Sequence, residues 1–153
     1  MRIVSDTSCL IILKKIDALW ILEEIFKEVL IPEEVKRELY KKEKKDFENV
    51  EYIRVVNADE KLAKIISIYL DRGEAEAISI AFTQDLPLII DDLKGRKFAE
   101  NLGIKYIGTL GILKIAKNKG IIKRIKPFID KLLERGYYLD EKLIGKFLKE
   151  IGE

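Results

Sequence analysis

The hydrophobic positions of this chain follow two patterns that alternate from one end to the other. Short aliphatic runs bounded by polar residues predict strands, and they lie at 2–5, 29–31, 52–56, 86–90 and 104–107. Longer stretches with apolar residues three and four positions apart predict helices, at 7–13, 17–26, 32–40, 59–70, 73–83, 92–102, 108–119, 124–135 and 140–150. Strands that alternate with helices predict an α/β fold of three layers, with a central parallel sheet covered by helices on both faces.

The length of 153 residues fits one domain with a substantial core. We expect a single domain over 1–153, in which residues 120–153 form a C-terminal helical extension and the run 52–56 lies at an edge of the sheet. The last helix carries apolar residues that either pack on this domain or form a surface for a partner or a second copy, namely Leu143, Ile144, Phe147, Leu148 and Ile151.

The scarcity of histidine and cysteine decides which chemistry remains. The chain has no histidine, which excludes Ser-His-Asp and Cys-His nucleophile systems and zinc sites that need imidazole. Its one cysteine, Cys9, lies in an apolar run, and we expect a buried structural thiol rather than a reactive one. Carboxylates are the groups left for catalysis. When carboxylates gather from distant points of a chain, they suit a hard cation such as Mg²⁺ or Mn²⁺.

The sequence shows no sign of a membrane or secretory address. No segment approaches the roughly 20 apolar residues of a membrane span, and the first residues lack the pattern of a signal peptide. We therefore expect a soluble cytoplasmic protein without a membrane partner, and the unpaired thiol agrees with a reducing compartment. Charged residues make up 37% of the chain, with lysine and glutamate frequent, a composition typical of thermophiles.

The formal net charge of +2 identifies no partner, but the basic residues are clustered. Residues 114–131 carry seven basic side chains and one acidic side chain, Asp130. Such a stretch suits contact with phosphates, and a solvated helix surface is the alternative interpretation.

Acidic residues directly follow two of the predicted strands. Asp6 comes after the first strand, and the pair Asp91 and Asp92 comes after the most hydrophobic one. Sites in parallel α/β sheets form beyond the C-terminal ends of strands, so we expect these acids at one edge. A helix N-cap explains Asp6 equally well and is the alternative for Asp92. Two adjacent acids are more than a cap requires, so Asp92 is the preferred ligand and Asp91 an alternate or a supporting group behind it.

Two further carboxylates lie on predicted helices. Glu38 borders the apolar stripe of its helix, and a surface pair with Lys42 is the alternative. Glu74 lies in the first turn of a helix that is apolar on almost every side, and Asp71 three residues earlier gives the spacing of a capping box. Glu76 is the alternate for Glu74, because carboxylates on so apolar a helix are costly to desolvate unless paired or bound to metal.

The order of these motifs resembles that of PIN-domain nucleases, specifically the VapC-like branch. Glu38 stands in a Pro-x5-Glu-Leu helix, Glu74 in Gly-Glu-Ala-Glu-Ala-Ile, and the acid pair follows Pro-Leu-Ile-Ile. The resemblance covers roughly 1–120, and the remaining residues look like an uncharacterised archaeal and bacterial PIN-type subfamily. Two positions depart from the family pattern: Glu74 stands where Asp is common, and no hydroxyl residue precedes Asp92 in its motif.

The resemblance implies a PIN-like fold and a metal-dependent endoribonuclease, often a homodimer and often the toxin partner of an antitoxin protein. Asp6, Glu38, Glu74 and Asp92 would hold Mg²⁺ or Mn²⁺, and a metal-activated water would hydrolyse RNA phosphodiesters. Basic side chains would contact the RNA backbone, and those that we assign to this role are Lys94, Arg96, Lys114, Lys117, Lys123 and Arg124.

Two other functions remain open from the sequence. A PIN-like module with weak or no catalysis would act through an antitoxin or another protein, and the absence of Mg²⁺ or Mn²⁺ binding would favour it. A phosphoryl-transfer or receiver-type domain is the third candidate. A receiver would carry its acid pair after the first strand, and a phosphatase would have Asp-x-Asp where this chain has Asp6-Thr7-Ser8.

Overall fold

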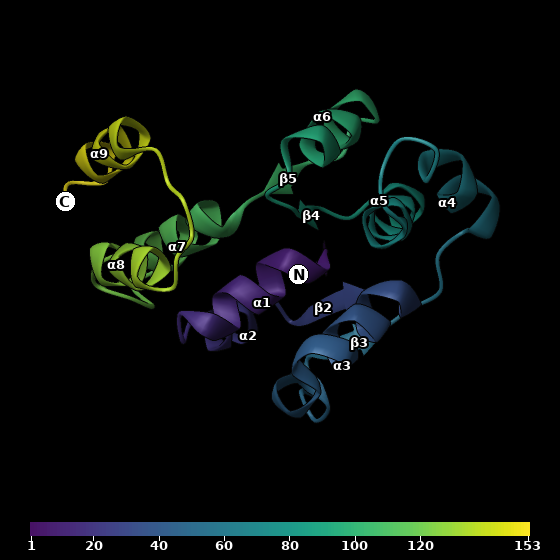
Figure 1. Ribbon diagram of the computed structural model, residues 1–153, viewed down its shortest axis with the longest axis horizontal. Helices are drawn as coiled ribbons and strands as arrows, with labels where there is room; N and C mark the ends of the chain where they lie inside the picture. The colour runs from purple at the N-terminus through teal and green to yellow at the C-terminus, as the bar shows by residue number, and fades with distance from the viewer.

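The computed structural model describes residues 1–153 and contains one five-stranded sheet in which all neighbouring strands are parallel. The strand order is β3-β2-β1-β4-β5 (Figure 1). The strands are β1 at Arg2–Ser5, β2 at Glu28–Ile31, β3 at Ile53–Val55, β4 at Leu88–Ile89 and β5 at Tyr106–Ile107. This arrangement confirms the predicted α/β class with a central parallel sheet, and β3 lies at an edge as expected.

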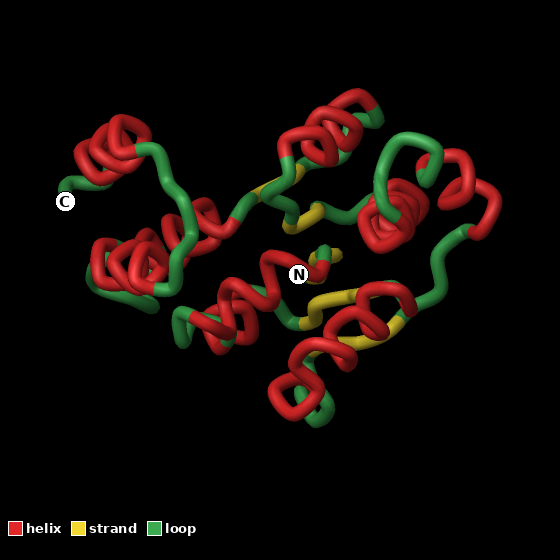
Figure 2. The backbone as a smooth tube through the Cα atoms, viewed as in Figure 1, coloured by secondary structure: helices red, strands yellow, loops and turns green.

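Nine helices connect the strands and continue beyond them (Figure 2). They are α1 at Thr7–Lys15, α2 at Trp20–Ile25, α3 at Glu33–Phe47, α4 at Glu60–Ile66, α5 at Arg72–Gln84, α6 at Leu93–Asn101, α7 at Thr109–Asn118, α8 at Lys126–Glu134 and α9 at Glu141–Glu150. Every connection between strands contains a helix, which parallel pairing requires. None of the helices has both the length and the apolar composition that a membrane crossing demands.

Helices α2, α3 and α4 differ most from their predicted bounds, and α4 ends at Ile66 rather than at Leu70. The helix predicted from Asp17 begins at Trp20, because Asp17 has a left-handed backbone with φ of 56° that a right-handed helix cannot include. Helix α3 runs to Phe47 rather than to Tyr40, with a break at Glu43 where φ is −143° and ψ is 45°. The residues after Tyr40 contain no glycine or proline, so no strong helix breaker stands there.

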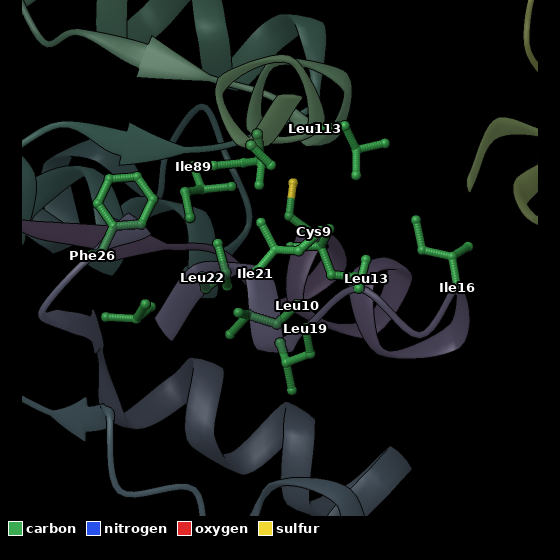
Figure 3. Packing of buried hydrophobic residues seen from close by; sticks show 14 of the residues in the cluster. Cys9, Leu10, Leu13, Ile16, Leu19, Ile21, Leu22, Phe26, Ile89 and Leu113 are labelled. Atoms are coloured by element: carbon green, nitrogen blue, oxygen red, sulfur yellow. The ribbon is translucent and has the colours of Figure 1, made fainter. Parts of the chain in front are cut away.

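Hydrophobic side chains cover both faces of the sheet. In β1, Ile3 packs into the larger cluster, with residues of α1, α2, α7 and α8, whereas Val4 packs into the other cluster, with residues of α5. Successive residues of a strand point to opposite faces, so a strand with two apolar faces is buried on both sides. Figure 3 shows the larger cluster, in which Cys9 lies beside Leu13 and Leu113. The thiol of Cys9 is fully buried, as the sequence predicted.

The C-terminal helices pack against the larger cluster through one face of α9. Ile144, Phe147, Leu148 and Ile151 contact this cluster, while Leu143 stays 60% exposed. The side chain of Glu153, only 5% exposed, joins this region to α7 and α8. It accepts hydrogen bonds from the Lys117 ammonium at 2.8 Å and from the backbone N–H of Ile125 at 2.8 Å. Most of the apolar face of α9 is therefore used within the chain.

Burial disfavours the charged form of Glu153, but its hydrogen bonds more than compensate. Donation from the Ile125 and Lys126 N–H groups and from Lys117 lowers the pKa of Glu153 to about 2. A carboxyl whose pKa is lower in the folded than in the unfolded state stabilises the fold while ionised. This stabilisation is complete above the unfolded pKa of 4.5 and disappears as the pH falls from 4.5 to about 2.

We predict that Glu153→Gln lowers the free energy of unfolding at pH 7 by about 1–2 kcal/mol, because charge-assisted hydrogen bonds are lost. The difference between variant and wild type should shrink as the pH falls towards 2. Urea unfolding at several pH values measures it, and Glu150→Gln, an exposed change at the end of α9, is the control. Equal stability of the two variants at pH 7 would show that Glu153 does not anchor the C-terminus.

Candidate active site

Asp6 and Asp92 lie at the C-terminal ends of two adjacent strands. β1 pairs with β4, and the N–H of Asp6 donates to the carbonyl of Ile89 at 3.2 Å, so the two strand ends are side by side. Asp6 caps α1 by accepting from the N–H of Cys9 at 3.1 Å, and Asp92 caps α6 by accepting from the N–H of Gly95 at 2.8 Å. Capping fixes both side chains at this edge without using all of their oxygen lone pairs.

Glu38 reaches the same region from α3 because Gly73 leaves room for it. A Cβ atom at position 73 would lie 2.6 Å from Oε1 of Glu38, closer than real carbon atoms approach. Helices α3 and α5 therefore come together at a glycine, and the carboxyl of Glu38 occupies the space that a side chain would fill. The physical requirement at Gly73 is close approach rather than an unusual backbone angle.

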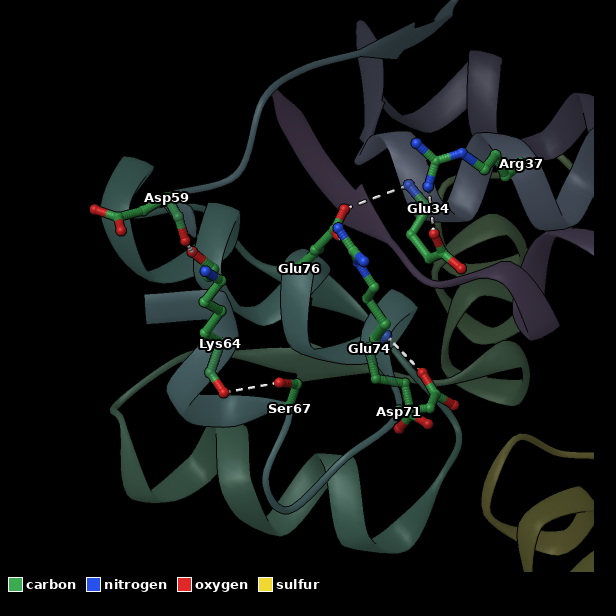
Figure 4. Close-up of polar contacts among 10 residues, drawn as sticks. Glu34, Arg37, Asp59, Lys64, Ser67, Asp71, Glu74 and Glu76 are labelled. Carbon is green, nitrogen blue, oxygen red and sulfur yellow. Dashed lines mark hydrogen bonds and ion pairs between the residues drawn. The ribbon is translucent and has the colours of Figure 1, made fainter. Parts of the chain in front are cut away.

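Glu74 points from the first turn of α5 toward α6. A Cβ at Gly95 would lie 2.8 Å from its Oε2 atom, and this oxygen is buried without a hydrogen-bond partner. Such an atom is costly to bury. The backbone N–H of Glu74 donates to Oδ1 of Asp71 at 2.8 Å (Figure 4). This oxygen of Glu74 is therefore not used within the protein.

Asp71 is the carboxyl that sequence reasoning did not assign to the site. It contributes negative charge at Asp6, Glu38 and Glu74. Its position three residues before Glu74 indicated a cap, which the structure confirms. Asp71 lies near the other acids because of how α5 packs against β1 and α3. The sequence around Asp71 does not indicate this packing.

Burial and like charge together disfavour ionisation in this group of carboxyls. Burial raises the pKa of Asp6 to about 7, with smaller contributions from the charges of Asp91 and Asp71. Burial also raises the pKa of Glu74 to about 9, helped by a hydrogen bond with Asp71 and by its charge and that of Asp92. Burial likewise raises the pKa of Glu38. At Glu38 the charge of Lys42 opposes the rise, and a cation near the other carboxyls would act in the same direction.

The donor set suits Mg²⁺ or Mn²⁺, which prefer oxygen ligands. In this conformation no three acidic side chains are close enough together to hold one ion. Mg²⁺ is commonly bound by one or two carboxylates, with water and substrate phosphates as the other ligands. A partly assembled set of carboxylates with an unpartnered buried oxygen fits that mode, so the residues present are compatible with a divalent ion.

Asp91 is fully engaged in hydrogen bonds that tie four elements together. It accepts from the hydroxyl of Thr109 at 2.6 Å and its N–H at 2.9 Å, from the thiol of Cys9 at 3.2 Å and from Arg96 at 3.3 Å. Burial and the charges of Asp6 and Asp91 raise the pKa of the Cys9 thiol, which keeps it a protonated donor. Asp91 thus joins the end of β4 to α1, α6 and α7.

Glu76 is used in a different place from Glu74. It accepts from the N–H of Glu34 at 3.3 Å and from Nε of Arg72 at 2.9 Å, and thereby connects α5 to the first turn of α3 (Figure 4). These two partners occupy its carboxylate, whereas Glu74 retains an unpartnered oxygen.

The basic residues considered for RNA contact are divided between inward and outward positions. Arg96 donates to the carbonyl of Ile90 at 2.9 Å and lies over the ring of Tyr106. Lys117 binds Glu153, and Nε of Arg124 lies 3.6 Å from the same carboxylate. The Arg124 side chain is nevertheless 61% exposed, and Lys94, Lys114 and Lys123 are exposed as well.

A family model described as DUF3368, PIN domain, matches residues 2–153. A solved structure with a similar fold is a PilT N-terminus domain protein, SSO1118, from the hyperthermophilic archaeon Sulfolobus solfataricus P2. The TM-score is 0.60 at 22% identity, and the similarity covers 76% of this chain and 93% of that chain. No curated protein matches the sequence.

We predict that Gly73→Ala weakens Mn²⁺ binding roughly tenfold, because the new methyl group displaces the carboxyl of Glu38. The protein should stay folded, since the displaced atom ends a flexible side chain and alanine favours a helix over glycine by about 0.5–1 kcal/mol. Calorimetric titration with Mn²⁺ measures the affinity. Gly145→Ala in α9, where no atom lies near the added Cβ, is the matched control. Unchanged affinity in both variants would remove Glu38 from the ion site.

Proposed function

The chain belongs to the PIN domain family, and from this premise we propose that it is a metal-dependent endoribonuclease that hydrolyses RNA phosphodiesters. PIN domains are generally nucleases. The observation that carries the proposal is the gathering of carboxyls at the C-terminal edge of the sheet, where Asp6 is buried and Glu74 is partly buried with one unpartnered oxygen. These groups come from four separate segments of the chain, and their mutual repulsion is a cost unless a cation offsets it.

In this proposal Asp6, Glu38, Glu74 and Asp92 hold Mg²⁺ or Mn²⁺, and Asp71 adds negative charge beside them. When bound, such an ion lowers the pKa of a water and offsets negative charge that develops on the phosphate. The caps at Asp6 and Asp92 hold two of these carboxyls in fixed positions. The hydrogen bonds of Asp91 hold the end of β4 to α1, α6 and α7 next to these carboxyls.

Water is the nucleophile that this site supports. The chain has no histidine, and the single thiol, Cys9, is buried and donates to Asp91. Neither imidazole nor thiolate chemistry is available, so a carboxylate of the group accepts the proton. The exposed Lys94, Lys114 and Lys123 provide positive charge for an RNA backbone.

The proposal includes the biological setting that the family resemblance implies. It comprises a toxin-like role with an antitoxin protein as partner, a homodimer and a cytoplasmic location. Residues 1–153 act as one domain, with 120–153 as a helical extension that packs on the same cluster as the sheet. The match of the family model across 2–153 supports treating the extension as part of the unit.

Two observations favour a second candidate, a PIN-like module with weak or no catalysis that acts through a protein partner. No three carboxyls are positioned to hold one ion, and Glu74 stands where the family commonly has Asp. Calorimetry distinguishes the two, because the second candidate binds neither Mg²⁺ nor Mn²⁺.

We predict that Asp6→Asn reduces Mn²⁺-dependent cleavage of defined RNAs by about 100-fold or more, because several kcal/mol of transition-state stabilisation depend on the ion. Asparagine is as good an N-cap as aspartate, and the change removes a buried like charge, so stability should not fall. Asp59→Asn is the matched control, because Asp59 caps α4 in the same way outside the acidic group. A variant at position 6 that cuts as fast as wild type would exclude this site.

A further inference from the structure

A polar cleft opens beside the acidic group, between α3, α4 and the first turn of α5. Its volume is about 920 Å³, and only three of its twelve lining residues are hydrophobic. Ligand sites commonly measure about 300–1,000 Å³, so the cleft can take a nucleotide. Figure 4 shows Arg37 of α3, Lys64 of α4 and Asp71 of α5 around this region.

The cleft and the proposed active site share one residue, Asp71. This residue lines the cleft, and its carboxyl also caps the turn that carries Glu74. A molecule in the cleft would therefore lie beside Asp71, whose charge acts on Asp6, Glu38 and Glu74. For a nuclease, the group in that position is the nucleotide next to the scissile phosphodiester.

The residues that line the cleft carry both positive and negative charges, which argues against a site that binds only phosphates. Three basic residues, Arg37, Lys64 and Arg72, face four acidic ones, which are Glu33, Glu60, Asp71 and Glu76. A groove that tracks a phosphate backbone is predominantly positive. A mixture of donors and acceptors instead matches the edge of a nucleobase, which both donates and accepts hydrogen bonds.

Several polar groups of the cleft are free to contact a base. Arg37 is held by Glu34 at 2.7 Å, which orients a guanidinium whose side chain is still 65% exposed. Arg72 is held in the same way by Glu76 and is 70% exposed. Arginine planes stack on unpaired bases, and their N–H groups read base edges. The amide of Asn57 is exposed and makes no hydrogen bond within the protein.

We propose that this cleft is a base-recognition subsite for one unpaired nucleotide of single-stranded RNA, adjacent to the bond that is cut. The inference rests on the proposed nuclease function and adds the residues that select the substrate. Arg37 and Asn57 contact the base, and Lys64 neutralises the neighbouring phosphate. Selection acts on single strands, because a paired base has its Watson–Crick edge occupied.

The experiment measures binding without cleavage, by fluorescence anisotropy in the Asp6→Asn background with Mg²⁺. The probes are labelled short uridine oligonucleotides that carry a central uridine, adenosine, cytidine or guanosine. We expect a preference of roughly tenfold for one central base, which Arg37→Gln and Asn57→Ala abolish. Lys64→Gln should weaken all four probes equally. Lys61→Gln, the same charge change on α4 outside the cleft, should leave affinity and preference unchanged.

Three results would overturn the subsite: no preference among the probes, no RNA binding, or a preference that survives both Arg37→Gln and Asn57→Ala. Equal weakening of every probe by Arg37→Gln would mean that the cleft contacts only phosphate. The nuclease proposal is judged separately, by Mn²⁺-dependent cleavage and its loss in Asp6→Asn. A protein that cleaves RNA but shows any of these binding results keeps its function and loses this subsite.

Discussion

Parallel pairing of β1 with both β2 and β4 is the constraint on which the rest of the structure depends. It forces every connection to cross over through a helix, and it places β1 in the middle with both faces covered. It also brings the C-terminal ends of β1 and β4 to one edge. Asp6 and Asp92 meet there because of the pairing, although the sequence separates them widely.

Helix capping turns that edge into an ordered group of acids. Asp6, Asp71 and Asp92 each accept a backbone N–H at the start of α1, α5 or α6. The positive ends of these helix dipoles favour negative charge where burial opposes it. A cap and a metal ligand are therefore compatible roles for one side chain, because a carboxylate has more lone pairs than one N–H uses.

The same group shows a conflict between stability and chemistry. Burial raises the pKa of Asp6 to about 7 and that of Glu74 to about 9, so ionising them disfavours the folded chain. At Glu153 the hydrogen bonds outweigh the cost of burial and lower the pKa instead. The edge of the sheet and the C-terminal region thus use carboxyls in opposite ways. One is satisfied within the protein, and the other leaves an oxygen of Glu74 without a partner.

The sequence by itself determined the alternation of strands and helices, the buried α5, the caps and the family. Each of these follows from the spacing and order of apolar and acidic residues along the chain. The adjacent apolar residues Ile3 and Val4 indicate a strand that is covered on both faces. The order of Asp6, Glu38, Glu74 and the acid pair identifies the PIN family. Only the tertiary structure decided that Asp71 joins the acids, that Glu76 instead connects α5 to α3, and that Glu153 pairs with Lys117. These outcomes depend on which helices pack together, and the contacts join residues far apart in the chain, where no periodic pattern relates one partner to the other.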